Sequence, residues 1–224
     1  MKLFFRYCLP GFSNCYVLGT EPDDYPPSNA GNGDETNPME EPMPEALLVD
    51  PGMIDEEILN FIENNELNLR GVLITHDHKN HIRGLRTLKK IYDVDIYGMN
   101  QFIEDYETIL LKDGDILHIG PFQVEVISIP GHSPDSAVFR IDNMLFTGDV
   151  LGAGLVGSTA SSYGATTQMT ALQSKLLSVP GDCIILPGHG PPSSLEAERR
   201  FNAGMQKFEQ RKNPKQQFIQ ELFD

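Results

Sequence analysis

Short apolar runs rich in aromatic and β-branched residues recur along the chain, and glycine, proline or polar turn residues close most of them. Runs of this length and composition predict β-strands. We expect strands over residues 3–8, 15–19, 46–52 (ending in a turn), 71–75, 95–97, 116–119, 123–129, 137–141, 144–146 and 183–186. The Asp142–Asn143 pair between two of these runs predicts a hairpin turn.

Helical spacing of apolar residues marks other segments. In residues 55–65, Ile58 and Ile62 share one face, and the acidic first turn suits the helix dipole. We also expect helices over residues 82–92, 168–177 and 195–210, a helical stretch around 101–106, and a short amphipathic turn over 218–222. Because strands alternate with helices in both halves, the pattern predicts an α/β fold with sheets sandwiched between helices.

Residues 21–45 follow neither pattern. They are rich in proline, glycine and asparagine and hold eight acidic residues with no Lys or Arg. Such a segment buries too little apolar surface to order itself, so we expect a flexible loop. A lid or docking segment and an inert insertion are the two roles that remain open.

Composition narrows the class of protein. The 224 residues are 40% hydrophobic and 22% charged, which fits a single globular domain over residues 1–224 and excludes a wholly disordered chain. No apolar run approaches the ~20 residues of a membrane span, and Arg6 and Pro10 interrupt the apolar start, so we expect a cytoplasmic protein. The net charge of −15 disfavours nucleic acid as a partner and leaves a small-molecule substrate.

Three of the six histidines, His76, His78 and His81, lie within six residues, directly after one predicted strand and before a predicted helix. His76 and His78 are two apart, so an extended loop points them the same way. Imidazoles suit transition metals, which makes a metal site the functional interpretation and a chance polar loop the alternative. Three more candidates follow later strands, namely His132, Asp149 and His189, whereas His118 lies inside a strand and is assigned no role.

These positions fall in four short motifs, His76-Asp-His-Lys-Asn-His81, Pro130-Gly-His-Ser-Pro-Asp-Ser136, Gly148-Asp149 and Pro187-Gly-His-Gly-Pro191. Their order resembles the metallo-β-lactamase superfamily, and within it the single-domain, glyoxalase-II-like thioester hydrolases. The resemblance implies an αββα sandwich with the metals at one edge between mixed sheets. It also implies a first metal site of His76, His78 and His132, a bridging Asp149, and a second site that His81 and His189 help to form.

Asn80 departs from the family, which has an aspartate at this position of H-x-H-x-D-H. The resemblance implies a catalytic role for this position and for Asp149, because the family aspartate binds the second metal and aims the bridging hydroxide. An amide has no charge to offer a cation. We therefore expect an intact first site and a weakened second site; an engineered, inactivating change at Asn80 is the alternative.

The implied activity is hydrolysis of a small thioester or related acyl substrate by a metal-bound hydroxide. The resemblance implies zinc as the cofactor, one ion or two, with iron or manganese as alternatives. Related thioesterases often have a G-R-T-D-like segment, and this chain has Gly157-Ser-Thr-Ala160 instead. Tyr163 is a candidate substrate-binding residue, or else an exposed loop tyrosine. Asp50 could orient a metal ligand or simply form a turn.

Two other functions remain open at this point. A mononuclear iron oxygenase, similar to the persulfide dioxygenases of the same superfamily, could use His76, His132 and Asp149 as a facial triad. A degenerate member could bind a metal or a partner without catalysis, with the acidic segment as its docking element. The metal content of the purified protein distinguishes these two functions from hydrolysis.

Overall fold

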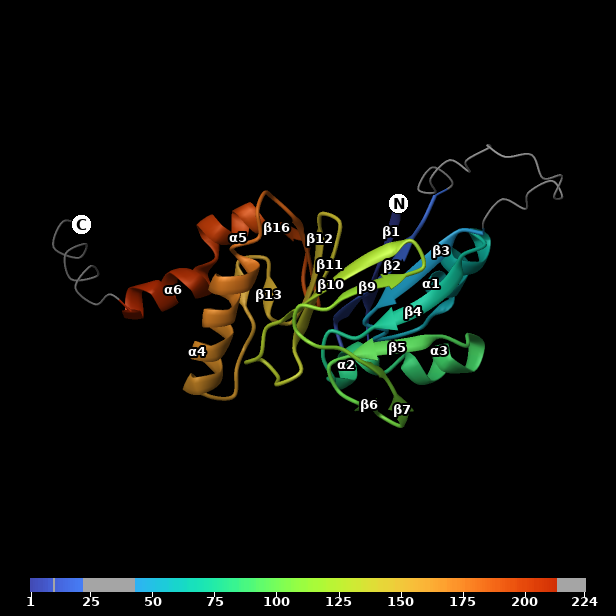
Figure 1. Cartoon of the computed structure of the whole chain (residues 1–224), viewed down its shortest axis with the longest axis horizontal. Coiled ribbons are helices and arrows are strands. Elements are labelled where there is room, and N and C mark those ends of the chain that lie inside the picture. The colour runs from blue at the N-terminus through green and yellow to red at the C-terminus, as the bar shows by residue number, and fades with distance from the viewer. Residues whose placement is uncertain (10, 22–42, 213–224) are drawn as a thin grey trace.

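Two six-stranded sheets form the centre of the molecule in the computed structural model, which describes residues 1–9, 11–21 and 43–212 (Figure 1). The first sheet has the spatial order β1 (Lys2–Cys8), β2 (Ser13–Gly19), β3 (Glu45–Val49), β4 (Asn68–Leu73), β5 (Asp95–Gly98), β8 (Ile109–Leu110). The second has the order β16 (Ser193–Ser194), β15 (Ile184–Pro187), β12 (Met144–Gly148), β11 (Ala137–Ile141), β10 (Phe122–Ser128), β9 (Ile116–Ile119). Both sheets mix parallel and antiparallel pairs.

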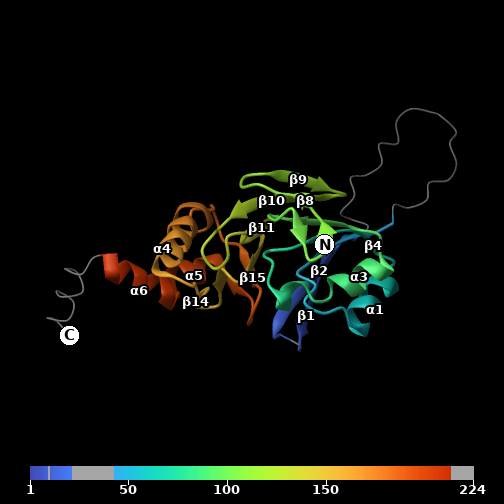
Figure 2. The same cartoon turned by 90° about the horizontal axis from the view of Figure 1, so that it is seen from below.

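Helices cover the outer face of each sheet, as Figures 1 and 2 show from two directions. The first sheet is covered by α1 (Glu56–Asn64) and α3 (Leu85–Ile91), with the short α2 (Lys79–Ile82) before α3. The second is covered by α4 (Ser162–Ala171), the π-helical turn η2 (Leu172–Leu176), α5 (Leu195–Phe201) and α6 (Ala203–Lys212). This layer order confirms the αββα sandwich.

Strand β3 shows why its sequence is apolar without a break. Ala46 and Leu48 pack into the core beneath α1 and α3, whereas Leu47 and Val49 pack into the core between the sheets. Successive side chains of a strand point to opposite faces, so a strand buried on both faces needs apolar residues at every position. Its burial carries Asp50, the next residue, into the interior.

The helical stretch expected around residues 101–106 is wrong. These residues form a hairpin of β6 (Phe102–Ile103) and β7 (Tyr106–Glu107), in which Ile103 pairs with Tyr106. Glu104 turns the chain with a positive φ of 50°, and Ile103 enters the core. A segment of six residues has little helical stability of its own, so tertiary contacts such as that of Ile103 decide its conformation.

Two helix boundaries also differ from expectation. The helix expected over 195–210 is two helices, because Asn202 leaves the helical conformation and its Oδ1 accepts hydrogen bonds from the N–H groups of Gly204 and Met205. The helix expected over 168–177 begins already at Ser162, where Ser161 caps it. Before it, the glycine-rich stretch forms a small hairpin of β13 (Leu151–Gly152) and β14 (Leu155–Val156).

Some expectations fall outside the described residues, including nearly all of the acidic segment 21–45 and the amphipathic turn at 218–222. Within the described part of the chain, no helix has both the length and the apolar character needed to cross a bilayer. The hairpin turn at Asp142–Asn143 is confirmed, since Ile141 pairs with Met144 across it. Cys8, Cys15 and Cys183 are buried free thiols.

Candidate functional site

The six predicted ligands converge where the two sheets meet. His76, His78 and His81 follow β4 of the first sheet, whereas His132, Asp149 and His189 follow β10, β12 and β15 of the second. Close approach of these strand ends requires small residues. A Cβ on Gly188 would lie 2.4 Å from Asp149 Oδ1 and 2.5 Å from His81 Cε1, so a side chain there would displace two of the candidate ligands.

The first group consists of His76, His78, His132 and Asp149, which can each offer one ligand atom within 4.8 Å of the others. Nε2 of His132 lies 3.1 Å from Nδ1 of His78 and 3.6 Å from Oδ2 of Asp149. Nε2 of His76 lies 3.8 Å from the same carboxylate oxygen. Three imidazoles and a carboxylate around one point form a donor set typical of zinc and iron sites.

The second group consists of His81, Asp149 and His189. Nε2 of His81 lies 3.2 Å from Oδ1 of Asp149, and Nε2 of His189 lies 3.5 Å from Oδ2. Asp149 therefore belongs to both groups and lies between them. This is the placement that a carboxylate bridging two cations would need.

Unpartnered atoms show that these groups suit a cation. His76 Nε2, His81 Nε2 and Asp149 Oδ1 are all buried and make no hydrogen bond of good geometry, although His81 Nε2 and Asp149 Oδ1 face each other at 3.2 Å. Buried polar atoms without partners are costly, and a cation bound here would satisfy all three. The residues present therefore fit a bound metal.

Hydrogen bonds at the opposite ring nitrogen orient four of the five histidines. Nδ1 contacts Thr75 Oγ1 in His76, Asp50 Oδ2 in His81, the Ser158 carbonyl in His132 and the Phe12 carbonyl in His189, at 2.6–3.1 Å. Because these oxygens accept a hydrogen bond, Nδ1 carries a proton, and Nε2 is the nitrogen left to bind a metal once any proton on it has been released. His78 instead turns its Nδ1 toward the group.

Asp50 holds this arrangement together from the end of β3. Its Oδ1 accepts a hydrogen bond from the Thr75 N–H at 2.8 Å, and its Oδ2 accepts from Thr75 Oγ1 at 2.7 Å and His81 Nδ1 at 2.9 Å. Its backbone has a φ of 51°, which Asp and Asn tolerate better than most residues. The interpretation of Asp50 as an orienting residue thus agrees with its contacts, and it also makes a turn.

The charges of the site follow from its burial. Burial and the neighbouring His81 lower the pKa of His76 to about 3, so its imidazole stays neutral. Burial alone would lower the pKa of His81, but the carboxylates of Asp50 and Asp149 outweigh it and raise that pKa to about 10. Burial likewise opposes ionisation of Asp149, yet His189 and His81 hold its pKa well below the usual range.

Asn80 lies on α2 beside His81, and its Nδ2 is 2.7 Å from Nε2 of His189. With Nδ1 of His189 bonded to the Phe12 carbonyl, the amide of Asn80 contacts the ring nitrogen that a second metal would require, and Asp149 raises the pKa of His189, which favours a proton there. Asn80 therefore has two features that matter for a second cation. It lacks the negative charge of an aspartate, and its amide contacts a nitrogen that the cation would bind. Both features disfavour a cation between His81 and His189.

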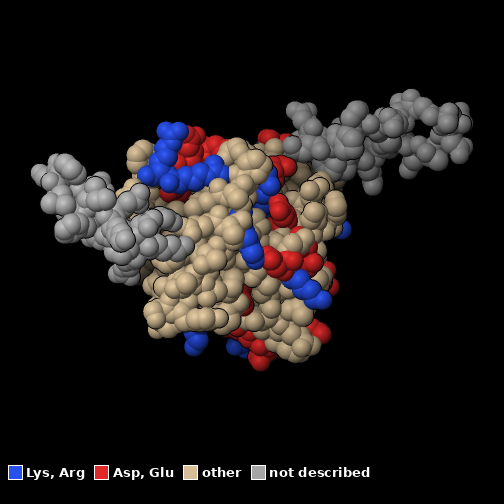
Figure 3. Space-filling view, turned by 60° about the vertical axis from the view of Figure 1, so that its left-hand side comes forward, with Lys and Arg blue, Asp and Glu red and all other residues tan. Residues whose placement is uncertain are grey.

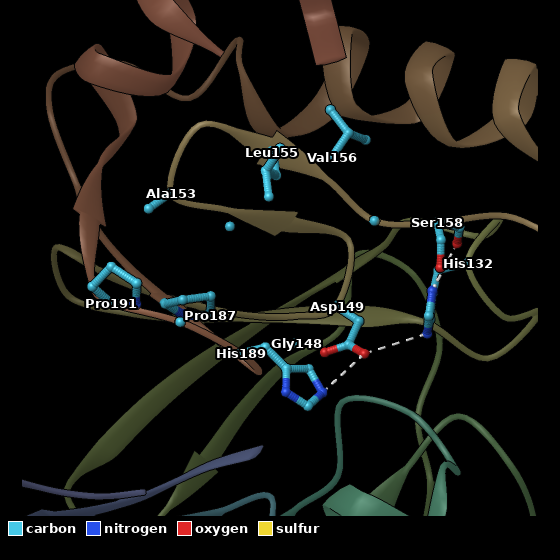
Figure 4. Close-up of a pocket in the computed structure, with 13 residues that line it drawn as sticks. His132, Gly148, Asp149, Ala153, Leu155, Val156, Ser158, Pro187, His189 and Pro191 are labelled. Carbon is cyan, nitrogen blue, oxygen red and sulfur yellow. Dashed lines mark hydrogen bonds and ion pairs between the residues drawn. The ribbon is translucent and has the colours of Figure 1, made fainter. Parts of the chain in front are cut away.

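A cavity of about 270 Å³ opens beside the two groups (Figure 4). Asp149 and His189 lie on one side of it, and Leu155 and Val156 of the β13–β14 hairpin lie on the other. Tyr163 does not line this cavity; it lies on α4 with 81% of its surface exposed. Its placement lends no support to the predicted role in substrate binding.

Sequence reasoning missed the partners that orient the imidazoles, namely the carbonyls of Phe12 and Ser158 and the hydroxyl of Thr75. Backbone carbonyls carry no signal in a sequence. It also missed the apolar wall of the cavity, because Leu155 and Val156 stand in a glycine-rich stretch that resembles a loop. Only the position of Thr75, directly before His76, could have suggested a role.

Comparison with known proteins agrees with this geometry. The chain is 31% identical to the hydroxyacylglutathione hydrolase GloC of Haemophilus influenzae, over 70% of this chain and 85% of that protein. It is 29% identical to the probable polyketide biosynthesis zinc-dependent hydrolase BaeB of Bacillus velezensis, over 76% and 84% of the two chains. Its fold matches TTHA1623 in a di-iron-bound form, with a TM-score of 0.67, 24% identity and coverage of 89% and 98%.

A family profile gives the assignment directly. The profile described as the Metallo-beta-lactamase superfamily matches residues 45–189, a span that contains all six candidate ligands. Together with the αββα fold and the two His/Asp groups that share Asp149, this match places the chain in the metallo-β-lactamase superfamily.

Proposed function

We propose that this protein is a metal-dependent hydrolase that cleaves thioesters of small acyl groups. The observation that carries the proposal is the shared Asp149 between two groups of imidazoles, with buried ligand atoms that make no hydrogen bond of good geometry. The similarity to a hydroxyacylglutathione hydrolase supports the reaction class. The adjoining cavity supplies a place for a substrate.

The first group would hold the catalytic ion through His76, His78, His132 and Asp149. Such an ion lowers the pKa of bound water to about 7 and polarises a carbonyl oxygen. The chain itself fixes the donor atoms. The Ser158 carbonyl and Thr75 Oγ1 hold His132 and His76 with their Nε2 atoms turned inward, and Asp149 stays ionised because of its lowered pKa.

The second group would hold a further ion weakly. Its donors are His81, His189 and the shared Asp149, and the amide of Asn80 competes for His189. We infer that zinc occupies the first group fully and the second partly, with iron or manganese as alternatives. One firmly bound ion suffices to activate water, as in other single-metal hydrolases.

A second candidate function is a mononuclear iron oxygenase. Its supporting observation is that His76, His132 and Asp149 lie together as two imidazoles and one carboxylate, the donor set of non-haem iron oxygenases. The contact of the Asn80 amide with Nε2 of His189 also favours a single ion. This activity would consume oxygen, and hydrolysis would not.

Chelation followed by reconstitution tests both candidates. The metal-free protein is loaded separately with zinc, iron and manganese, then assayed with acyl thioesters, lactones, phosphodiesters and, with an oxygen electrode, glutathione persulfide. We expect chelation to abolish thioester cleavage and zinc to restore it. Oxygen uptake by the iron form would favour the oxygenase, and no turnover of any substrate in any metal form would overturn both proposals.

A further inference from the structure

The cavity beside the candidate metal groups has an uncharged lining apart from the groups themselves. His132, Asp149 and His189 form one end of it. The rest consists of glycines, Ala153, the side chains of Leu155 and Val156, two prolines and Ser158. Among the described residues that line it, none is Lys or Arg. A charged part of a substrate would therefore find no counter-ion in the part of the lining that lies away from the metal groups.

The apolar wall opposite Asp149 is part of a regular secondary-structure element. It is formed by the β13–β14 hairpin, where Gly154 makes the turn with a φ of 75°. Leu155 is 66% exposed although its side chain borders the cavity, so the wall presents apolar surface to whatever enters. Apolar surface at the mouth of a catalytic cavity indicates contact with an apolar ligand.

A buried carboxylate fastens this hairpin to α5. Glu198 is 2% exposed, and both of its carboxylate oxygens lie 3.0 Å from the Gly154 N–H. The same carboxylate accepts hydrogen bonds from Ser193 Oγ and Asn202 Nδ2, each at 2.6 Å. The Gly154 carbonyl in turn accepts from the Ala203 N–H at 3.1 Å. Gly154 is thus held at both backbone polar groups, which keeps the wall in place.

Size and charge together limit what fits. At about 270 Å³ the cavity is smaller than the roughly 300–1,000 Å³ of pockets that hold drug-sized ligands. A carboxylate placed against the β13–β14 wall would have no Lys or Arg among the lining residues to pair with, and burying an unpaired charge is costly. The thiol halves of biological thioesters are larger and charged, so the acyl half is the part that matches the cavity.

We propose that this cavity binds the acyl group of the substrate, and that this group is small, apolar and uncharged. The inference rests on the proposed thioester hydrolysis and adds the substrate class. The β13–β14 wall selects the acyl group, and the thiol half extends away from the cavity.

Matched thioesters of one thiol test the selection by charge. Butanoyl and succinyl thioesters have acyl chains of equal carbon number and differ by a carboxylate. We expect kcat/KM for the butanoyl ester to be at least tenfold higher, and a change of thiol at constant acyl group to alter it less than threefold. Equal values for the two acyl groups, or a stronger dependence on the thiol than on the acyl group, would overturn the proposal.

A variant of the wall tests its location. Leu155→Lys should reverse the preference, so that the succinyl ester becomes the better substrate. Leu110→Lys is the matched control, because Leu110 is a half-exposed leucine on β8 of the other sheet and does not line the cavity. An unchanged preference in Leu155→Lys would contradict the assignment.

A binding measurement separates this inference from the proposed reaction. Hexanamide and the singly charged monoamide of adipic acid have equal chain length, and methyl NMR signals of Leu155 and Val156 report their binding without turnover. We expect shifts with hexanamide and much smaller ones with the charged amide. Shifts without turnover of any thioester would retain the pocket and overturn the hydrolase, whereas turnover without shifts would overturn the pocket alone.

Discussion

At the scale of single residues, Asn80 has the strongest effect on what the site can bind. Its Nδ2 lies 2.7 Å from the nitrogen that His189 would offer a second cation. An aspartate there would instead accept and would add a negative charge beside His81 and His189. The same backbone can thus hold one ion or two, depending on one side-chain group.

Asn80→Asp should therefore tighten the second site. We expect a rise of about tenfold or more in affinity for the second zinc ion, since an opposite charge replaces a competing donor. Calorimetric titration and elemental analysis measure it. Asn143→Asp, in the exposed β11–β12 turn, is the control. Unchanged stoichiometry in Asn80→Asp would contradict the role given to Asn80.

Asp50 acts on the metal groups through Thr75 and His81. Asp50→Asn keeps a residue that tolerates the positive φ but removes a charge and one acceptor. We expect a loss of ~1–3 kcal/mol in the free energy of unfolding and about 10- to 100-fold weaker metal binding. Asp142→Asn, at a φ of 52° in the exposed hairpin turn, should change neither quantity. Equal metal affinity in both variants would refute the role of Asp50.

The raised pKa of His81 predicts a proton linkage. Below about pH 10 the imidazole of His81 is protonated on both ring nitrogens in the metal-free protein. A metal that binds Nε2 must displace the proton there. Affinity at the second group should therefore rise with pH, by up to tenfold per unit, for as long as His81 is protonated before the second ion binds. Calorimetry in buffers of different ionisation enthalpy should show about one proton released per second ion at pH 7.5. No release would mean that His81 is neutral before binding.

At the scale of elements, the strands and ligands that follow a regular sequence pattern could be predicted. Apolar runs located the central strands, and His76, His132, Asp149 and His189 follow strands whose ends meet at one edge. Residues 101–106 and the β13–β14 hairpin escaped prediction for a physical reason. Both are short, and contacts with distant residues such as Glu198 decide their conformation.

The hairpin gives a prediction at this scale. Glu198→Gln puts an amide donor among three donors, so at least one hydrogen bond is lost and the wall loosens. We expect about tenfold higher KM for apolar acyl thioesters, an unchanged metal content and faster amide exchange in residues 151–156. Glu196→Gln on the exposed side of α5 is the control. A parallel loss of metal would show that Glu198 supports the fold rather than the wall.

At the scale of the whole molecule, the site depends on how two sheets meet. Each sheet supplies three of the six ligands, so neither half could assemble the site alone. Charged side chains are not grouped by sign on the face that Figure 3 shows. On the face in Figure 3, basic and acidic side chains lie close together around a broad uncharged area, without a stripe of one sign.

Elemental analysis of protein purified without chelator tests the central claim, that side chains from both sheets bind a common ion. Three proteins are compared, namely the parent chain, His132→Ala, and His118→Ala, which removes a histidine of β9 outside both metal groups. The account predicts at least one transition-metal ion per chain in the parent and in His118→Ala, and a loss of most of it in His132→Ala. Equal metal content in all three, or none in the parent after incubation with zinc, would contradict it.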